Sequence, residues 1–248
     1  MAFISRLFSA MLSVAILTAT YASPRLAARP ADTSIAGGAS GLSVAAALHV
    51  LGEAGIEFTE ETGLYIEQSM EEMTAMLAGW GMDVSQFMTY PVILSMLGTG
   101  KYDADTHSFI PLTNSVYAFD AECYDILEAY ADFLRAVTRI SNDEIRIEAY
   151  HSDVEEATLE SGIGVQEVFF HLNGKAYCFT AQFYYDWMDC TLIDYVNQIL
   201  DEQGIAKRLW CMFDGGQGFV VFYNTVEWAR EFSERTNCPL ALTAHEAL

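Results

Sequence analysis

The chain has 248 residues, of which 52% are hydrophobic and 13% aromatic, so it is not an intrinsically disordered acidic chain. Its formal net charge is −22, with 34 acidic residues against 12 lysines and arginines. This charge argues strongly against binding to nucleic acid, because phosphates need basic residues to replace their counterions, and against binding to anionic membrane surfaces. We expect a soluble acidic protein whose partner is an unknown protein or a cationic ligand.

The first 31 residues differ in charge from the rest of the chain. They contain Arg6, Arg25 and Arg29 and no acidic residue, and a chargeless, mostly apolar run follows Arg6. A basic start, an apolar middle and small residues around Ala22 are the three parts of a secretory signal. We therefore predict a signal-like leader at residues 1–22, a flexible linker at 23–41, and a secreted or extracytoplasmic protein. The alternatives are an organelle-targeting peptide and the ordinary N-terminus of a cytoplasmic protein.

Serine and threonine residues dilute the apolar run, so no stable membrane span is expected. Beyond the leader, no lysine or arginine occurs between residues 30 and 100, although nine acidic residues do. A cationic partner, a divalent ion or simple solubility would each suit such a surface, and we expect solubility to be its main role.

Residues 42–140 are expected to be mainly helical. A segment of small residues at 42–51 precedes Thr59, which is a favourable N-cap because two glutamates follow it in the first turn. Apolar residues at helical spacing then predict a helix that reaches residue 78.

The second half of this helical region is interrupted by a predicted loop. Pro91 is expected to begin a short helix over 92–97 that a glycine ends. Glycine, aspartate, proline and asparagine at 98–119 predict a loop. Asp120 is then expected to cap a helix that runs to residue 139.

From residue 141 the pattern changes to that of strands. Alternation over 144–151 predicts a half-buried strand, and an acidic loop follows it. Two runs rich in aromatic and β-branched residues, 165–172 and 175–185, are separated by Asn173 and Gly174. Because Asn-Gly accepts the positive φ angles of a type I′ turn, these runs are predicted to form a hairpin.

A second hairpin is predicted further along the chain, over 207–213 and 218–224. A helix that begins at Asp189 or Thr191 precedes it, and a last helix, capped by Thr225, follows it.

The predicted fold class is α+β, with a helical region at 42–140 and an antiparallel α+β domain at 141–248. The order in the second part is β, β-hairpin, α, β-hairpin, α. Its connections are short, and parallel neighbours would need a long crossover, so the sheet should be mostly antiparallel. We expect the helices to bury their apolar stripes on this sheet, with the N-terminal helices packed against it or beside it.

Two loops contain residues that could bind an ion. Asp103, Asp105 and His107 alternate as calcium ligands do, but Ser108 and Asn114 stand where an EF-hand requires glycine and glutamate. We expect turn-forming residues there rather than a metal site. The glycine-rich segment 214–218 lacks the lysine of a P-loop and precedes a strand, so we expect a hairpin loop whose glycines adopt positive φ angles.

Cys190 is the strongest candidate for a nucleophile, because it follows the first hairpin and precedes a helix, where the pKa of a thiol can fall. His151 or His171 could serve as its base, and Asp186 and Asp189 are nearby carboxylates. We favour the simpler interpretation that Asp189 caps the helix and Cys190 packs into the core. The five cysteines show no CxxC spacing, so a structural zinc site has little support.

The first hairpin also carries a concentration of aromatic residues. One face of the hairpin must belong to the core, and we expect the N-terminal helices to cover the other face. An uncovered second face would be an exposed aromatic patch and therefore a binding surface. The residues concerned are Phe169, Phe170, Tyr177, Phe179, Phe183, Tyr184, Tyr185 and Trp187.

These observations favour an exported binding or interaction protein without catalytic activity, which predicts an exposed apolar patch or groove on the sheet. The alternative is a hydrolase-type enzyme that uses Cys190 or His151 with nearby carboxylates, which predicts a pocket where these groups converge. A third possibility, a metal-dependent acidic module, predicts that carboxylates such as Asp103, Asp105 and Asp186 cluster. The sequence assigns no catalytic, cofactor-binding or metal-binding residue and no cofactor.

Overall fold

The structure is a computed structural model that describes residues 43–123 and 125–248. The predicted leader at 1–22 and linker at 23–41 lie outside the described residues. Within the described ranges, no helix combines the length and the apolar character that crossing a membrane requires.

Helices and strands follow one another in this order: α2 (Val44–Glu53), α3 (Glu60–Gly79), the 3-10 helix η2 (Val84–Gln86), α4 (Tyr90–Thr99), β1 (Lys101–Asp103), β2 (Ser108–Ile110), β3 (Tyr117–Asp120), α5 (Ile126–Ile140), β4 (Ile147–Val154), α6 (Glu156–Ser161), β5 (Ile163–Leu172), β6 (Lys175–Tyr184), α7 (Leu192–Glu202), β7 (Arg208–Phe213), β8 (Gly218–Asn224), α8 (Val226–Thr236) and α9 (Ala244–Ala247).

In the part of the chain that the structure describes, the strands form two antiparallel sheets of three strands and one small hairpin, β1-β2, which confirms the α+β class. We call β3-β8-β7 the central sheet and β4-β5-β6 the outer sheet. The sequence predicted a single sheet. The strands instead form two sheets, and residues of α5 and α7 share one apolar core with both of them.

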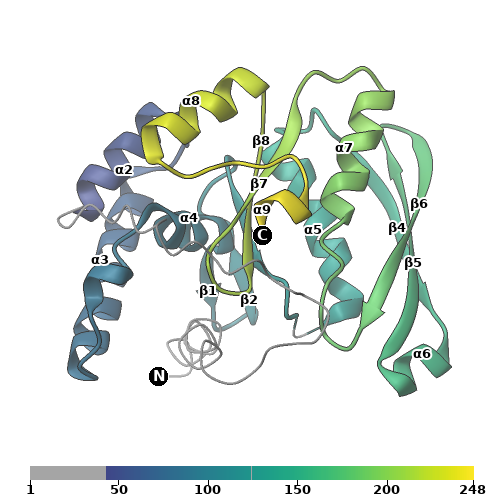
Figure 1. The fold of residues 1–248 in the computed structure, drawn as a ribbon, viewed down its shortest axis with the longest axis horizontal. Coiled ribbons are helices and arrows are strands. Elements are labelled where there is room, and N and C mark those ends of the chain that lie inside the picture. Colours follow the sequence, from purple (N-terminus) through teal and green to yellow (C-terminus); the bar gives the residue numbers. More distant parts are fainter. Residues whose placement is uncertain (1–42, 124) are drawn as a thin grey trace.

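The elements are stacked in four layers, as Figure 1 shows. Helices α2, α3, α4 and α8 cover one face of the central sheet, where Trp210, Met212, Val220 and Phe222 are buried. Helices α5 and α7 lie between the two sheets and share a second apolar core with both. Every residue from Gly218 to Tyr223 in β8 is buried, as expected for a strand covered on both faces.

Local signals in the sequence predicted several elements correctly. The side chain of Thr59 accepts a hydrogen bond at the start of α3, and that of Thr225 does the same at the start of α8. Asn173 and Gly174 have φ angles of 51° and 80°, as a type I′ turn requires, and they join β5 to β6. Gly204 adopts a φ of 69° just after α7.

The region between α4 and α5 differs most from the prediction. The predicted loop at 98–119 contains β1, β2 and most of β3. Asp120 ends β3, where it pairs with Gly218, and the true N-cap of α5 is Asp125, whose side chain accepts from the amide of Leu127. The prediction failed because the pairing of β3 with β8 is a long-range contact that no local pattern contains.

Several smaller features of the helices and strands also differ from the prediction. The short helix predicted over 92–97 was expected to end at Gly98 and Gly100. Gly100 is the C-cap of α4, but Gly98 lies inside this helix, where a Cβ would come 2.5 Å from the backbone nitrogen of Ala118. The alternation predicted over 144–151 is interrupted at Ala149, which adopts a φ of 51° at a bulge in β4 and is exposed. The predicted acidic loop after β4 contains the short helix α6, and α9 follows what was predicted to be the last helix.

Candidate functional site

Among the described residues, one face of the outer sheet consists mostly of exposed side chains. The inner face of this sheet packs on α5 and α7 through residues such as Val168, Phe170, Leu172 and Phe179, all of which are buried. We expected the N-terminal helices to cover the other face, but this was wrong, because those helices pack on the central sheet instead. Of the layers that the described residues form, the outer sheet is the last (Figure 1).

One end of this open face carries an apolar surface that we call the aromatic corner, defined by Ile163, Val165, Tyr184, Tyr185 and Trp187. Their side chains are 37% to 56% exposed. Ile163 pairs with Tyr184 across β5 and β6, and Tyr184 forms a bridge with Trp187 across the turn that follows. Exposed apolar groups gathered in this way are typical of an interaction surface.

The geometry of the aromatic corner is fixed by the backbone. Tyr185 has a φ of 52°, which is unusual for a residue with a side chain, and its amide donates to the carbonyl oxygen of Gly162 at 2.6 Å. Gly162 has no room for a side chain, because a Cβ there would meet the ring of Tyr185 at 2.4 Å. The rings of Tyr184 and Tyr185 are 5.1 Å apart in an edge-to-face arrangement.

Two carboxylates face each other on the same open face. Asp153 of β4 is directly opposite Glu167 of β5, and both are exposed. Like charges at directly opposite positions of an antiparallel pair destabilise the sheet. Glu167 lies two residues from Val165 of the aromatic corner, and no lysine or arginine occurs between residues 147 and 174.

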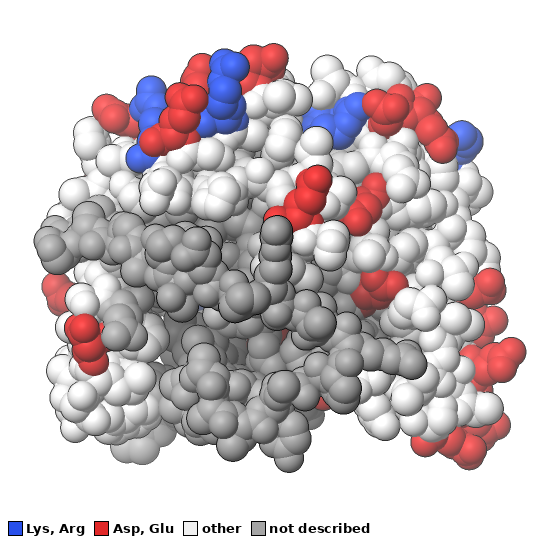
Figure 2. All heavy atoms as spheres, in the orientation of Figure 1, with Lys and Arg blue, Asp and Glu red and all other residues white. Residues whose placement is uncertain are grey.

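More acidic residues surround the aromatic corner. Glu122 forms a bridge with Trp187 and accepts from the side chain of Gln217, and Asp120 lies two residues before it. Burial raises the pKa of Asp120 to about 6, and the negative charges of Glu122 and Asp214 add to this effect. Figure 2 shows carboxylates along the side formed by the outer sheet and α6, whereas the basic residues on the face shown lie along the upper rim, with carboxylates among them.

The other end of the open face holds the two candidate bases. His151 stacks on the ring of Phe169 at 6.2 Å, and Cys178 is the residue directly opposite Phe169 on β6. Two residues beyond Phe169 on β5, His171 pairs with Glu148 of β4.

Cys190 is not brought together with these histidines. It packs against the core inside the outer sheet, while His151 and His171 lie on the opposite, open face. Its Sγ donates to the carbonyl oxygen of Met188 at 3.5 Å, and burial raises the pKa of the thiol, which opposes nucleophilic reactivity. Asp189 accepts from the amide of Thr191 just before α7.

The remaining candidate loops have structural explanations. Asp103 accepts from the amide of Asp105 and from the hydroxyl of Thr106, as a turn-forming aspartate does, in the turn between β1 and β2. Within residues 43–123 and 125–248, no group of three or more histidine, cysteine, aspartate or glutamate side chains is placed to hold a metal ion. All five cysteines are free thiols.

The glycine-rich loop at 214–218 is the β7–β8 turn, as predicted, but positive φ angles do not explain all its glycines. Gly215 has a φ of 89°. Gly218 is required for a different reason, because a Cβ there would meet the carboxylate of Asp214 at 2.3 Å, and this carboxylate accepts from the amides of Gly216 and Gly218.

Comparison with known proteins gives no relative from which a site could be transferred. No protein-family model, no curated protein and no solved structure matches the chain. The candidate site therefore depends on the geometry and chemistry of the open face alone.

Proposed function

We propose that this protein is a binding protein without catalytic activity, and that the open face of the outer sheet holds a cationic partner. An apolar part of the partner would lie on the aromatic corner. A lysine or arginine of the partner would lie between Asp153 and Glu167, where it removes the repulsion between the two carboxylates. The opposed pair beside exposed aromatic rings is the observation that carries the proposal.

Charge favours a different protein as the partner rather than a second copy of this chain. Two copies would each carry a net charge of −22, and contact through the open face would bring their carboxylates together. A basic partner is attracted by the same carboxylates, and its approach is accelerated at low salt.

The alternative functions have less support. A hydrolase based on Cys190 requires a base within hydrogen-bond reach, and both candidate histidines lie across the sheet from the thiol. A metal-dependent module requires converging carboxylates, but Asp103 is the last residue of β1, whereas Asp186 follows β6.

The proposal is tested by Glu167→Lys, with Asp105→Lys as the matched control. Both substitutions change the net charge equally, but Asp105 lies in the exposed β1–β2 turn. Glu167→Lys should raise the free energy of unfolding by roughly 0.2–1 kcal/mol, because it replaces a repulsive pair with an attractive one. It should at the same time weaken binding of a fluorescein-labelled peptide of alternating lysine and valine by about tenfold.

The control separates local from general electrostatics. Asp105→Lys should leave the peptide affinity close to that of the unaltered protein. Equal weakening by both substitutions would mean that only net charge attracts the peptide, and the proposal would then be wrong. A second pair tests the apolar half of the site: Tyr184→Ser should weaken binding, whereas Val226→Ser, at another exposed apolar residue, should not.

Export is a separate proposal that depends on the leader at residues 1–22. A signal peptide would be removed from the mature protein. Intact-mass analysis of the natively produced protein should therefore give a mass that lacks these residues. A mass that retains them would contradict the proposal without affecting the binding proposal.

A further inference from the structure

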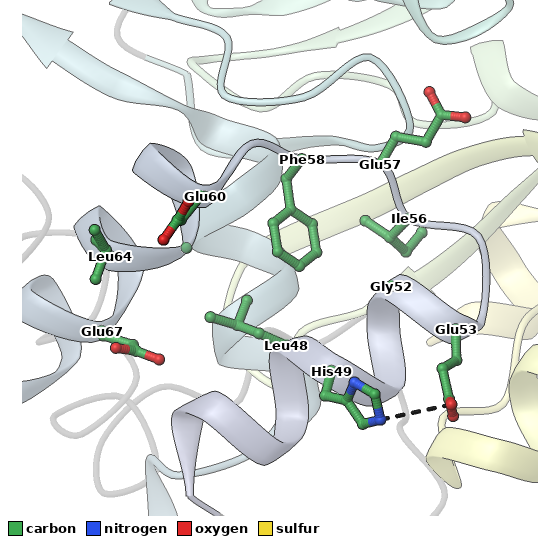
Figure 3. A pocket seen from close by; sticks show the side chains of 11 residues that line it. Leu48, His49, Gly52, Glu53, Ile56, Glu57, Phe58, Glu60, Leu64 and Glu67 are labelled. Atoms are coloured by element: carbon green, nitrogen blue, oxygen red, sulfur yellow. Dashed lines mark ion pairs between the residues drawn. The ribbon is translucent and has the colours of Figure 1, made fainter.

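A groove lies between α2 and the start of α3, in the layer of helices farthest from the outer sheet (Figure 1). Its volume is about 710 Å³. Figure 3 shows Phe58 between Leu48 and Ile56 at its centre, with His49 and Glu53 coming from α2. Leu64 of α3 lines the same groove and is 60% exposed.

The rim of the groove is acidic. Glu53, Glu57, Glu60 and Glu67 line it, and no lysine or arginine occurs between residues 30 and 100. Glu53 has two neighbouring side chains, because the Nε2 atom of His49 lies 3.5 Å from its carboxylate and the guanidinium of Arg235 of α8 lies 3.9 Å from it. Among the described residues, no ion pair involves the other three glutamates.

Two glycines line the groove at helix positions where the fold does not require glycine. Gly52 belongs to α2 and Gly63 to α3, and neither has a positive φ angle. A Cβ at Gly52 would meet nothing within 4 Å, and a Cβ at Gly63 would only reach ordinary contact with Phe58 and Leu48. Glycine weakens a helix relative to alanine, so both helices bear a cost that packing does not explain. Close approach of a ligand would explain it, because both glycines line the groove.

We infer that this groove binds an amphipathic, lysine- or arginine-bearing helix of a partner protein. A helix that lays its apolar face between two other helices is a common mode of peptide recognition. One large apolar side chain of the partner would rest on Leu48 and Phe58 beside the glycines, and its basic residues would meet Glu57, Glu60 and Glu67. This site is independent of the open face of the outer sheet, which lies in the opposite layer of the fold (Figure 1).

The test uses the full chain and a fluorescein-labelled helical peptide that carries leucines on one face and lysines on the other. Gly52→Trp should weaken binding by about tenfold or more, because the indole would occupy the groove. Gly79→Trp is the matched control, because it adds the same indole at an exposed residue of α3 that does not line the groove and where an added Cβ meets nothing within 4 Å. It should leave the affinity within about twofold of that of the unaltered protein.

The charge contribution is measured with Glu57→Gln, Glu60→Gln and Glu67→Gln combined. This variant should lose most of the salt dependence of binding, because exposed charges are screened by salt. A scrambled peptide of the same composition should bind about tenfold more weakly, since it has no apolar face.

Three results would overturn the inference. The first is unchanged binding by the Gly52→Trp variant, and the second is equal affinity for the scrambled peptide. The third is a dimer of the unaltered protein that Gly52→Trp dissociates in sedimentation, which would assign the groove to a second copy of the chain. Glu167→Lys serves as a further control, because it should not change binding of the helical peptide beyond the effect of Asp105→Lys.

Discussion

Replacing Asp120 by asparagine should stabilise the protein at neutral pH. Burial raises the pKa of Asp120 to about 6, because the ionised carboxylate is half-buried at the end of β3 near the charges of Glu122 and Asp214. The Oδ1 atom of Asp120 accepts from the amide of Glu122 at 3.0 Å, and an asparagine oxygen can accept the same hydrogen bond. The substitution therefore removes a charge without removing this contact.

The magnitude follows from the difference between the folded and the ordinary pKa. A change from 3.8 to about 6 corresponds to a gross cost of about 3 kcal/mol for keeping the carboxylate ionised in the folded protein. Asp120 remains partly open to water, which screens its interactions, so we expect a net gain of about 1–2 kcal/mol for Asp120→Asn at pH 7.

The destabilising effect of Asp120 depends on pH. Because the folded protein holds the proton more tightly than the unfolded chain, stability falls as the pH rises from about 4 to about 6. Above pH 6 the whole penalty is present, and below pH 4 both states are protonated, so Asp120 contributes nothing. The gain from Asp120→Asn should therefore be complete at pH 7 and nearly absent at pH 4.

Urea unfolding of the two proteins at a series of pH values measures this gain. Asp105→Asn, at an exposed turn, is the control and should change the free energy of unfolding by less than about 0.5 kcal/mol at every pH. A gain of the same size at pH 4 and pH 7, or a loss of stability at pH 7, would refute the reasoning.

Three further predictions concern packing, a buried amide and thiol reactivity. Gly98→Ala should lower the free energy of unfolding, measured with urea, by roughly 2 kcal/mol or more, because the added Cβ would meet the backbone of Ala118. The control Gly79→Ala should raise it by up to about 1 kcal/mol, because nothing lies within 4 Å of the added Cβ. Asn197→Ala should lower the free energy of unfolding by about 3 kcal/mol, because three hydrogen bonds to backbone groups are lost, two of them buried and one partly buried. Iodoacetamide at pH 8 should label Cys178 first in the folded protein, because it is the exposed thiol, and mass analysis showing another thiol modified as fast would contradict this.

The candidate site was only partly predictable from the sequence. The alternating aromatic residues of the first hairpin indicated two apolar faces, and the Asn173-Gly174 turn fixed their register. Whether the second face was covered depended on where the N-terminal helices pack, and this is decided by contacts far apart in the chain. The like-charge pair of Asp153 and Glu167 was not predicted, because it depends on the register of β4 against β5, which the bulge at Ala149 shifts.

The groove between α2 and α3 was missed for a similar reason. The absence of basic residues from 30 to 100 was visible in the sequence, but we interpreted it as a solvated surface. The signal that could have indicated a groove was the pair Gly52 and Gly63, since glycine inside a helix has a structural or a functional reason. Only the positions of both helices show that the two glycines face the same space.

The sequence by itself determined the α+β class, the hairpin at Asn173-Gly174 and the helix starts at Thr59 and Thr225, because these depend on interactions between residues a few positions apart. Tertiary structure alone decided that the strands form two sheets, that Asp120 ends a strand instead of capping a helix, and that one aromatic face is left open. Those outcomes depend on which apolar surfaces bury one another, and this choice is made among segments that are distant in the chain.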